Sequence, residues 1–195
     1  MADALKRRPL VGDVLAARNG ALIVPGLGSP TWDCFAAEDS PETLSSWGGM
    51  GLAVPTALGI AIAQPDRRVL CITGDGEMMM GIGALAVVAA QKPKNLGILV
   101  LDNEHFGETG RQRGLTSGAT DLAAIATGAG IAATQTVRTE AEAAGLTAFL
   151  FETPGPVLAV AKIAVSDEPW ALPEKDGATV ARRFRDSLGI PASSS

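Results

Sequence analysis

The most constraining feature of this sequence is a strand–loop–helix–strand–loop pattern near its middle. A β-rich run at residues 69–73 stops at the segment Gly74-Asp75-Gly76. A helix of small residues is predicted from about 78 to 91, because Pro93 closes its pattern. A second apolar run, 96–101, completes the unit. This order predicts a βαβ unit, which builds parallel sheets.

Oxygen-bearing side chains follow both predicted strands. Asp75 comes after the first strand, and Asp102-Asn103 ends the second. Because parallel strands end at the same edge of a sheet, we expect Asp75 and Asn103 to lie side by side, although residues 77–102 separate Gly76 from Asn103. A carboxylate and an amide oxygen suit Mg²⁺, and the glycines beside Asp75 let a phosphate approach the backbone. The pattern favours a metal-bound diphosphate, although helix N-cap or Asp-Gly turn remains the rival interpretation of Asp75.

The composition favours one α/β domain. The 195 residues are 47% hydrophobic and 4% aromatic, with 23 glycines. These values predict a single doubly wound domain over 1–195, with a mostly parallel sheet flanked by helices. The net charge is −5 without a basic stripe, which argues against nucleic-acid binding. No signal peptide or membrane span is evident, so a cytoplasmic protein is expected.

The remaining elements are expected from local periodicity and turn residues. We expect a short amphipathic helix within residues 1–19, a strand at 21–24 followed by a glycine-rich loop at 25–30, and a short helix and loop within 31–44. Further helices are expected at about 52–64, 121–128, 139–150 and 179–188, and strands at about 135–137 and 156–165. Residues 166–195 are expected to form an extension with a frayed tail. Cys34 and Cys71 show no metal-binding spacing.

The GDG segment, its spacer and the Asn-terminated strand resemble the cofactor signature of thiamine-diphosphate (ThDP) enzymes. The usual form ends in Asn-Asn, whereas this chain has Asp102-Asn103. The run DNEHFGETGRQ, residues 102–112, narrows the resemblance to the β subunits of sulfopyruvate decarboxylases and the C-terminal part of phosphonopyruvate decarboxylases. The resemblance covers about residues 20–165.

The resemblance implies ThDP and Mg²⁺ as cofactors. The metal ligands would be the side chains of Asp75 and Asn103 and the backbone carbonyl of His105. Gly48 would offer its carbonyl to the pyrimidine amino group, and Met50 would bend the cofactor. The full set of implied cofactor contacts is Gly28, Ser29, Gly48, Met50, Gly74, Asp75, Gly76, Glu77, Asn103, His105, Phe106, Gly107, Glu108 and Thr109.

The resemblance also implies a partner. In the family, a Glu on a separate pyrimidine-binding domain activates the cofactor, and residues 1–20 leave no room for that domain. We therefore expect a partner subunit that supplies this Glu, in an α2β2 or larger assembly. The implied activity is decarboxylation of a small 2-oxo acid, with sulfopyruvate and phosphonopyruvate as the nearest analogies. A carboligase of the acetolactate-synthase type, a non-catalytic cofactor-binding subunit and a nucleotide-binding module remain alternatives, although no Walker-type loop or GxGxxG turn supports the last.

Four side chains near the motif keep two interpretations. His105 and Glu108 are candidates for contact with the substrate, but an isolated His in a loop is more often simply solvated. Arg111 and Arg113 are either surface charges or contacts for an anionic substrate tail.

Overall fold

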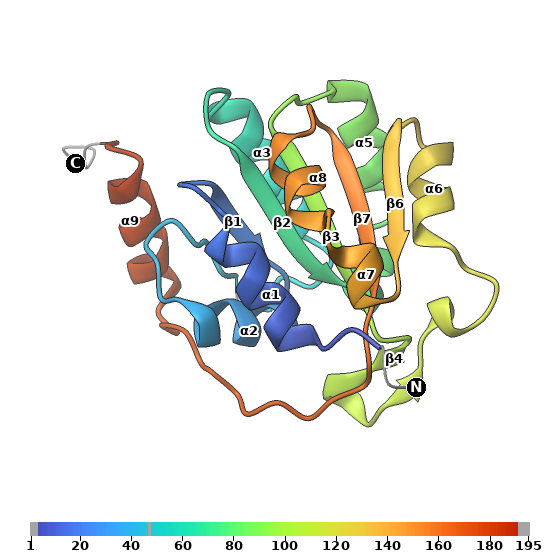
Figure 1. Cartoon of the computed structure of the whole chain (residues 1–195). Coiled ribbons are helices and arrows are strands. Elements are labelled where there is room, and N and C mark those ends of the chain that lie inside the picture. Colours follow the sequence, from blue (N-terminus) through green and yellow to red (C-terminus); the bar gives the residue numbers. More distant parts are fainter. Residues whose placement is uncertain (1–3, 47, 191–195) are drawn as a thin grey trace.

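A five-stranded parallel sheet forms the centre of the molecule (Figure 1). The computed structural model describes residues 4–46 and 48–190. The strand order is β1-β2-β3-β7-β6, and every neighbouring pair in this sheet is parallel. The strands are β1 Leu22–Pro25, β2 Val69–Gly74, β3 Leu96–Asp102, β6 Ala133–Val137 and β7 Val157–Lys162. The predicted α/β class is confirmed.

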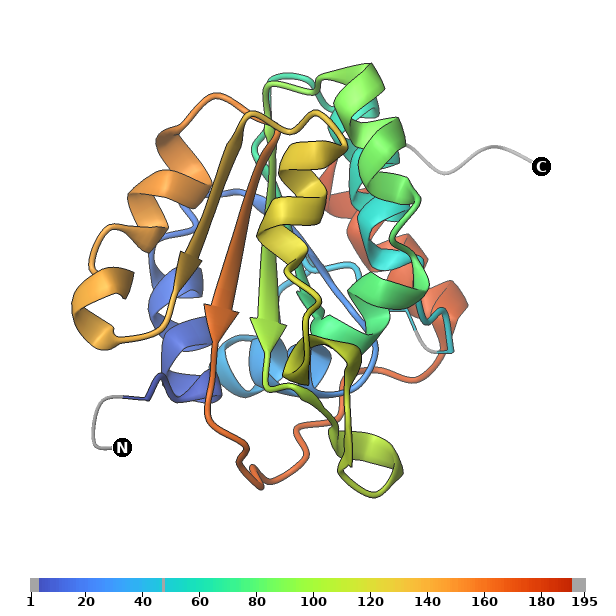
Figure 2. The same ribbon diagram turned by 90° about the vertical axis from the view of Figure 1, so that its right-hand side faces the viewer.

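Helices cover both faces of the sheet, as Figure 2 shows with the sheet nearly edge-on. On one face α3, α5 and α6 pack on alternate strand side chains, such as Cys71 and Ile98. On the other face α1, α2 and α8 pack on the intervening ones, such as Ile72 and Leu99. The helices are α1 Arg7–Ala16, α2 Ser29–Ala37, α3 Ala53–Ala63, α5 Ala84–Gln91, α6 Leu122–Gly128, α7 Glu140–Ala143 and α8 Leu146–Glu152. The two apolar faces explain why the buried strands read as continuous hydrophobic runs.

The single helix predicted over 78–91 is wrong. Two helices occupy this stretch, α4 Asp75–Met80 and α5, separated by a turn at residues 81–83. A Cβ atom on Gly81 would lie 2.3 Å from the carbonyl oxygen of Gly51, so only glycine permits this approach. The helix breaks where the Gly51 backbone packs against it. The polar loop expected at Gly74-Asp75-Gly76 is also absent, because α4 begins directly at the end of β2.

Two other helices differ from the expectations. Helix α2 begins at Ser29, so the loop after β1 is shorter than residues 25–30. The helix expected over 139–150 divides into α7 and α8 at Gly145, which precedes the first residue of α8. Glycine is a poor residue for a helix interior, which accounts for the division.

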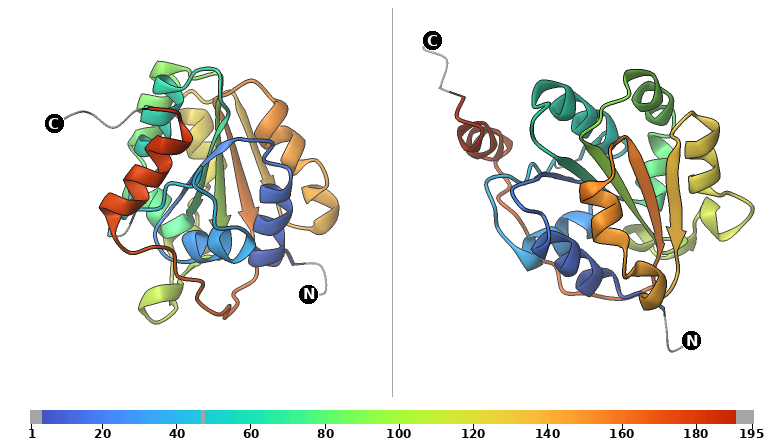
Figure 3. Two further views of the ribbon diagram at one scale, coloured as in Figure 1. Left: turned by 90° about the vertical axis from the view of Figure 1, so that its left-hand side faces the viewer. Right: turned by 45° about the horizontal axis from the view of Figure 1, so that its top comes forward.

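The chain after β7 crosses the carboxyl edge of the sheet. Residues 164–176 lack helix and strand and lead to α9 Gly177–Ser187, which lies at the β1 end of the domain (Figure 3). Val180 and Phe184 are the buried side chains of α9. Phe184 joins the apolar core on the face of the sheet that α3, α5 and α6 cover. This segment therefore passes the edge at which β2 and β3 end. Among the described residues, no helix has the length and apolar character needed to cross a membrane.

Candidate active site

The carboxyl ends of β2 and β3 meet at a cavity of about 200 Å³. Every residue that the resemblance assigns to the cofactor lines this inner cavity, except Gly28 and Gly48. The cavity residues from that set are Ser29, Met50, Gly74, Asp75, Gly76, Glu77, Asn103, His105, Phe106, Gly107, Glu108 and Thr109. The structure thus brings Asp75 and Asn103 to one cavity, as the βαβ pattern predicts. Their roles as ligands stay a prediction.

Asp75 is buried beside a second carboxylate. The Thr116 hydroxyl lies 2.7 Å from Oδ1 of Asp102 and 3.1 Å from Oδ2 of Asp75. Since one hydroxyl hydrogen serves one acceptor at a time, the two carboxylates share a single donor. Burial, together with the charge of Asp102, raises the pKa of Asp75 to about 6. A cation at Asp75 would offset both effects. The N-cap of α4 is Gly74, so the N-cap interpretation of Asp75 is wrong.

The turn after β3 holds the Asn103 amide in a defined orientation. Its Oδ1 accepts a hydrogen bond from the backbone N–H of His105 at 2.9 Å, and His105 Nδ1 lies 2.8 Å from the backbone oxygen of Asn103. A second lone pair on Oδ1 remains for a metal ion. Among the described residues, no group of three or more His, Cys, Asp or Glu side chains could hold a metal. A magnesium ion here would therefore need the mixed oxygen set of Asp75, Asn103 and a backbone carbonyl, which suits its preference for oxygen ligands.

Asp102 stands where the usual signature has Asn, and its carboxylate pairs with a lysine. Asp102 is 2% exposed, and its Oδ2 lies 2.7 Å from Nζ of Lys162. Lys162 is also 2.8 Å from Oε1 of Glu104. Asp102 and Lys162 are opposite each other in the β3–β7 register. The added negative charge is thus compensated within the sheet.

The Glu77 side chain links two loops to α4 through hydrogen bonds, a role that the sequence did not reveal. Its Oε2 accepts hydrogen bonds from the Leu27 N–H at 3.0 Å and the Thr73 hydroxyl at 2.9 Å. Its Oε1 accepts from the Gly51 N–H at 3.3 Å. A Cβ atom on Gly26 would lie 1.7 Å from Oε2. One buried carboxylate therefore fixes the loop after β1 and the loop before α3 to α4. Burial raises its pKa.

Glu108 joins the loop after β3 to α2. Its Oε1 accepts from the Ser29 hydroxyl at 2.9 Å and from Trp32 Nε1 at 3.3 Å. This loop contains a short hairpin, β4 His105–Phe106 with β5 Gln112–Arg113, and two 3-10 turns, η1 Gly107–Thr109 and η2 Leu115–Ser117. The η2 turn supplies Thr116. The loop is thereby tied to both α2 and the buried carboxylates.

Gly28 and Gly48 lie outside the lining of the inner cavity. Both have positive φ angles, 78° and 74°, which favour glycine. A Cβ atom on Gly28 would contact Glu108, whereas one on Gly48 would meet open space. The expected carbonyl contact of Gly48 therefore stays a prediction. Met50 is 37% exposed and lines the cavity, and its contact with the cofactor stays a prediction.

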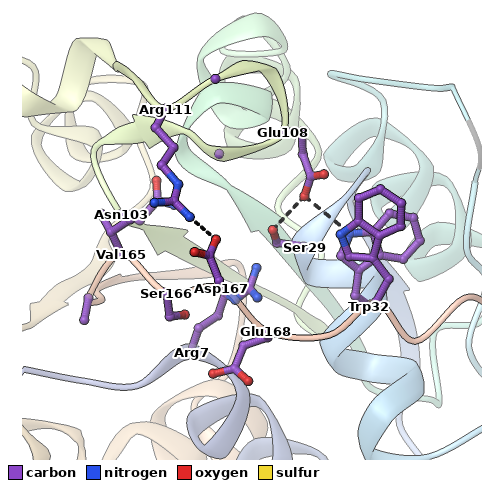
Figure 4. A pocket seen from close by; sticks show the side chains of 14 residues that line it. Arg7, Ser29, Trp32, Asn103, Glu108, Arg111, Val165, Ser166, Asp167 and Glu168 are labelled. Carbon is purple, nitrogen blue, oxygen red and sulfur yellow. Dashed lines mark hydrogen bonds and ion pairs between the residues drawn. The ribbon is translucent and has the colours of Figure 1, made fainter.

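A second cavity of about 340 Å³ adjoins the first (Figure 4). This outer cavity shares Arg7, Ser29, Asn103, Gly107 and Glu108 with the inner one. Residues 164–168 and Trp170 form part of its wall, and Trp170 stacks on Trp32 with ring centroids 6.2 Å apart. Arg111 lines the outer cavity and pairs with Asp167. Arg113 lines neither cavity.

Comparison with known proteins defines the class of this chain. The family model described as "Thiamine pyrophosphate enzyme, C-terminal TPP binding domain" matches residues 31–161. The chain therefore belongs to the thiamine pyrophosphate enzyme family through its C-terminal cofactor-binding domain, which confirms the resemblance seen in the sequence.

Two relatives narrow the placement within the family. The chain is 36% identical over 108 residues to the sulfopyruvate decarboxylase subunit beta of Methanothermobacter thermautotrophicus, covering 55% of this chain and 58% of that protein. It is 34% identical over 176 residues to the phosphonopyruvate decarboxylase of Streptomyces viridochromogenes, covering 88% of this chain and 43% of that protein. The chain thus spans about half of the length of these relatives.

A solved structure confirms the fold. A putative thiamin diphosphate-dependent enzyme from Mycobacterium smegmatis superposes with a TM-score of 0.70 at 25% identity. The match covers 84% of this chain and 32% of that one. The cofactor-binding domain fold is shared.

Proposed function

We propose that this chain is the diphosphate-binding subunit of a two-component, ThDP- and Mg²⁺-dependent 2-oxo acid decarboxylase. Its substrate would be a small, anionic 2-oxo acid of the sulfopyruvate or phosphonopyruvate type. The observation that carries the proposal is the convergence of Asp75 and Asn103 on one cavity in a chain of this family. The decarboxylase activity is the one for which the two relatives are named, and the proposal extends it to this chain.

The residues of this chain would hold and orient the cofactor. Asp75 and Asn103, with the His105 carbonyl, would bind the metal, and the backbone N–H groups of Gly76 and Glu77 would face the diphosphate. The Glu77 carboxylate would hold the loops around this site in place through its bonds to the N–H groups of Leu27 and Gly51. The chemistry that ThDP supplies when bound is a nucleophilic carbon and an electron sink for decarboxylation.

A partner subunit would complete the site. The Methanothermobacter relative is named as a subunit beta, which supports a second chain in the present case. That chain would carry the pyrimidine-binding domain and the Glu that moves the cofactor proton. An assembly of α2β2 type or larger, with the active site between subunits, follows from this arrangement.

Calorimetry with the chain and its co-purified partner tests the proposal. We expect ThDP to bind only with Mg²⁺, and the assembled enzyme to release CO₂ from sulfopyruvate or phosphonopyruvate. Binding of ATP or NAD in place of ThDP would contradict the cofactor assignment. Complete turnover by this chain alone would contradict the partner. Acetolactate formed from pyruvate, without free aldehyde, would instead establish a carboligase.

A further inference from the structure

Arg7 lies at the junction of the two cavities. It is the first residue of α1, is 6% exposed, and lines both the inner and the outer cavity. In Figure 4 the Arg7 and Arg111 side chains enter from opposite sides of the outer cavity. A buried guanidinium facing a cavity is unusual, because burial of an incompletely paired charge is costly.

The buried charges around Arg7 do not balance. Arg7 and Arg8 share one carboxylate, that of Asp33, which is 0% exposed. Arg8 Nε donates to Asp33 Oδ1 at 2.9 Å, and its Nη2 donates to the Pro169 carbonyl at 2.6 Å. Arg7 Nε lies 2.8 Å from Asp33 Oδ2, but neither atom forms a hydrogen bond within the described residues. Within this trio, two guanidinium groups on one carboxylate leave one excess positive charge, although the charge of Glu168 also acts on Asp33.

Three other charged groups of the outer cavity, Arg111, Asp167 and Glu108, have partners of their own. Arg111 pairs with Asp167, and the Glu108 carboxylate accepts hydrogen bonds from Ser29 and Trp32. Glu168 also lines a separate depression together with Arg8, and in Figure 4 its carboxylate points away from the centre of the cavity. The unbalanced group that faces the cavity is therefore Arg7.

We propose that Arg7 and the outer cavity form a binding site for a tetrahedral oxyanion, either a sulfonate, a phosphonate or a phosphate. A guanidinium presents two parallel N–H groups that match two oxygens of such an anion. The cavity of about 340 Å³ leaves room for a group of this size. This inference rests on the proposed function and names a group that the same site would bind. The anion would be either the acidic tail of the 2-oxo acid or the terminal phosphate of the cofactor.

The direct test uses the full chain without ThDP. Inorganic phosphate and methylphosphonate are titrated while the backbone amide signals are followed by NMR. We expect the Arg7 amide and its neighbours to shift, and Arg7→Gln to weaken anion binding by about tenfold or more. Arg113→Gln is the matched control, because it removes the same kind of charge at a residue that lines neither cavity. Its affinity should change by about twofold or less.

The titration of the unmodified chain needs no variant, so poor folding of Arg7→Gln leaves the test intact. Arg7→Lys provides a second variant that keeps the charge but loses the planar pair of donors. An unchanged Arg7 signal at high phosphate would overturn the proposal, and so would equal losses of affinity in the Arg7→Gln and Arg113→Gln variants.

Two measurements on the assembled enzyme identify the source of the anion. A higher KM of Arg7→Gln for sulfopyruvate or phosphonopyruvate, but not for pyruvate, assigns the site to the substrate tail. A higher Kd for ThDP assigns it to the cofactor phosphate. Failure of the chain to bind ThDP would refute the proposed function, whereas the phosphate titration would still decide the anion site.

Discussion

Nζ of Lys162 lies 2.7 Å from Oδ2 of Asp102, directly across the β3–β7 register. The family signature usually has an amide at the position of Asp102, and this chain has a buried carboxylate instead. The Lys162 side chain is 25% exposed, so its ammonium keeps contact with solvent while neutralising Asp102. The aspartate and the lysine therefore form a unit, and the substitution within the motif depends on a residue sixty positions later in the chain (102 to 162).

Removing the lysine should destabilise the fold. Lys162→Met leaves Asp102 buried without its cation, and we expect a loss of about 3 kcal/mol, the lower end of the range for breaking a buried pair, because Lys162 is partly exposed. Chemical denaturation measures this change. In the double variant Asp102→Asn/Lys162→Met, the neutral amide restores the usual family residue, and most of the lost stability should return. A double variant as unstable as Lys162→Met would contradict the pairing.

Asp75→Ala should abolish Mg²⁺-dependent ThDP binding in the assembled enzyme. The fold should remain intact, because Gly74 rather than Asp75 precedes α4 as its N-cap and the carboxylate of Asp75 lies close to that of Asp102. Calorimetry gives the affinity, and circular dichroism gives the melting temperature. Asp66→Ala, at an exposed position, is the control and should bind as the parent does. An unchanged affinity of Asp75→Ala would rule out its role as a metal ligand.

Gly26 and Glu77 should be coupled energetically. Gly26→Ala places a methyl group where Glu77 Oε2 lies, and we expect a loss of about 1–3 kcal/mol from the forced displacement. Glu77→Ala should cost about 1–3 kcal/mol, because the Leu27 and Gly51 N–H groups lose their acceptor. The double variant should be less unstable than the sum, since each change disrupts the same contact. If the two losses of unfolding free energy, measured by urea denaturation, simply add in the double variant, the contact between Gly26 and Glu77 contributes little to stability.

Asp167→Asn should strengthen anion binding in the outer cavity. Asp167 pairs with Arg111, so its neutralisation leaves a second guanidinium free in the outer cavity, on the side opposite Arg7. We expect about a two- to fivefold lower Kd for methylphosphonate, a modest gain because the pair is exposed to solvent. The same NMR titration measures it, and the gain should disappear in the double variant Asp167→Asn/Arg111→Gln. A Kd that rises in Asp167→Asn would contradict the placement of the anion next to Arg111.

The local sequence pattern was sufficient to predict the central part of the fold. Alternating strands and helices predicted the parallel sheet, and the Gly74-Asp75-Gly76 segment with Asn103 predicted two ligand positions at one edge. This success has a simple cause, since parallel strands connected by a helix must end on the same side. The break at Gly81 could not be predicted, because it arises from the approach of Gly51, thirty positions earlier (51 to 81).

The sequence by itself therefore determined the class of fold and the position of the Asp75–Asn103 pair. The tertiary structure alone decided which distant side chains support that pair: Thr116 between two carboxylates, Lys162 opposite Asp102, Glu77 across two loops, and Arg7 at the junction of the cavities. The physical reason is that periodicity and turn chemistry report on neighbours in the chain. Hydrogen bonds and ion pairs between elements depend instead on how helices and strands pack. Residues from these four separate segments therefore come near the site only in the folded structure.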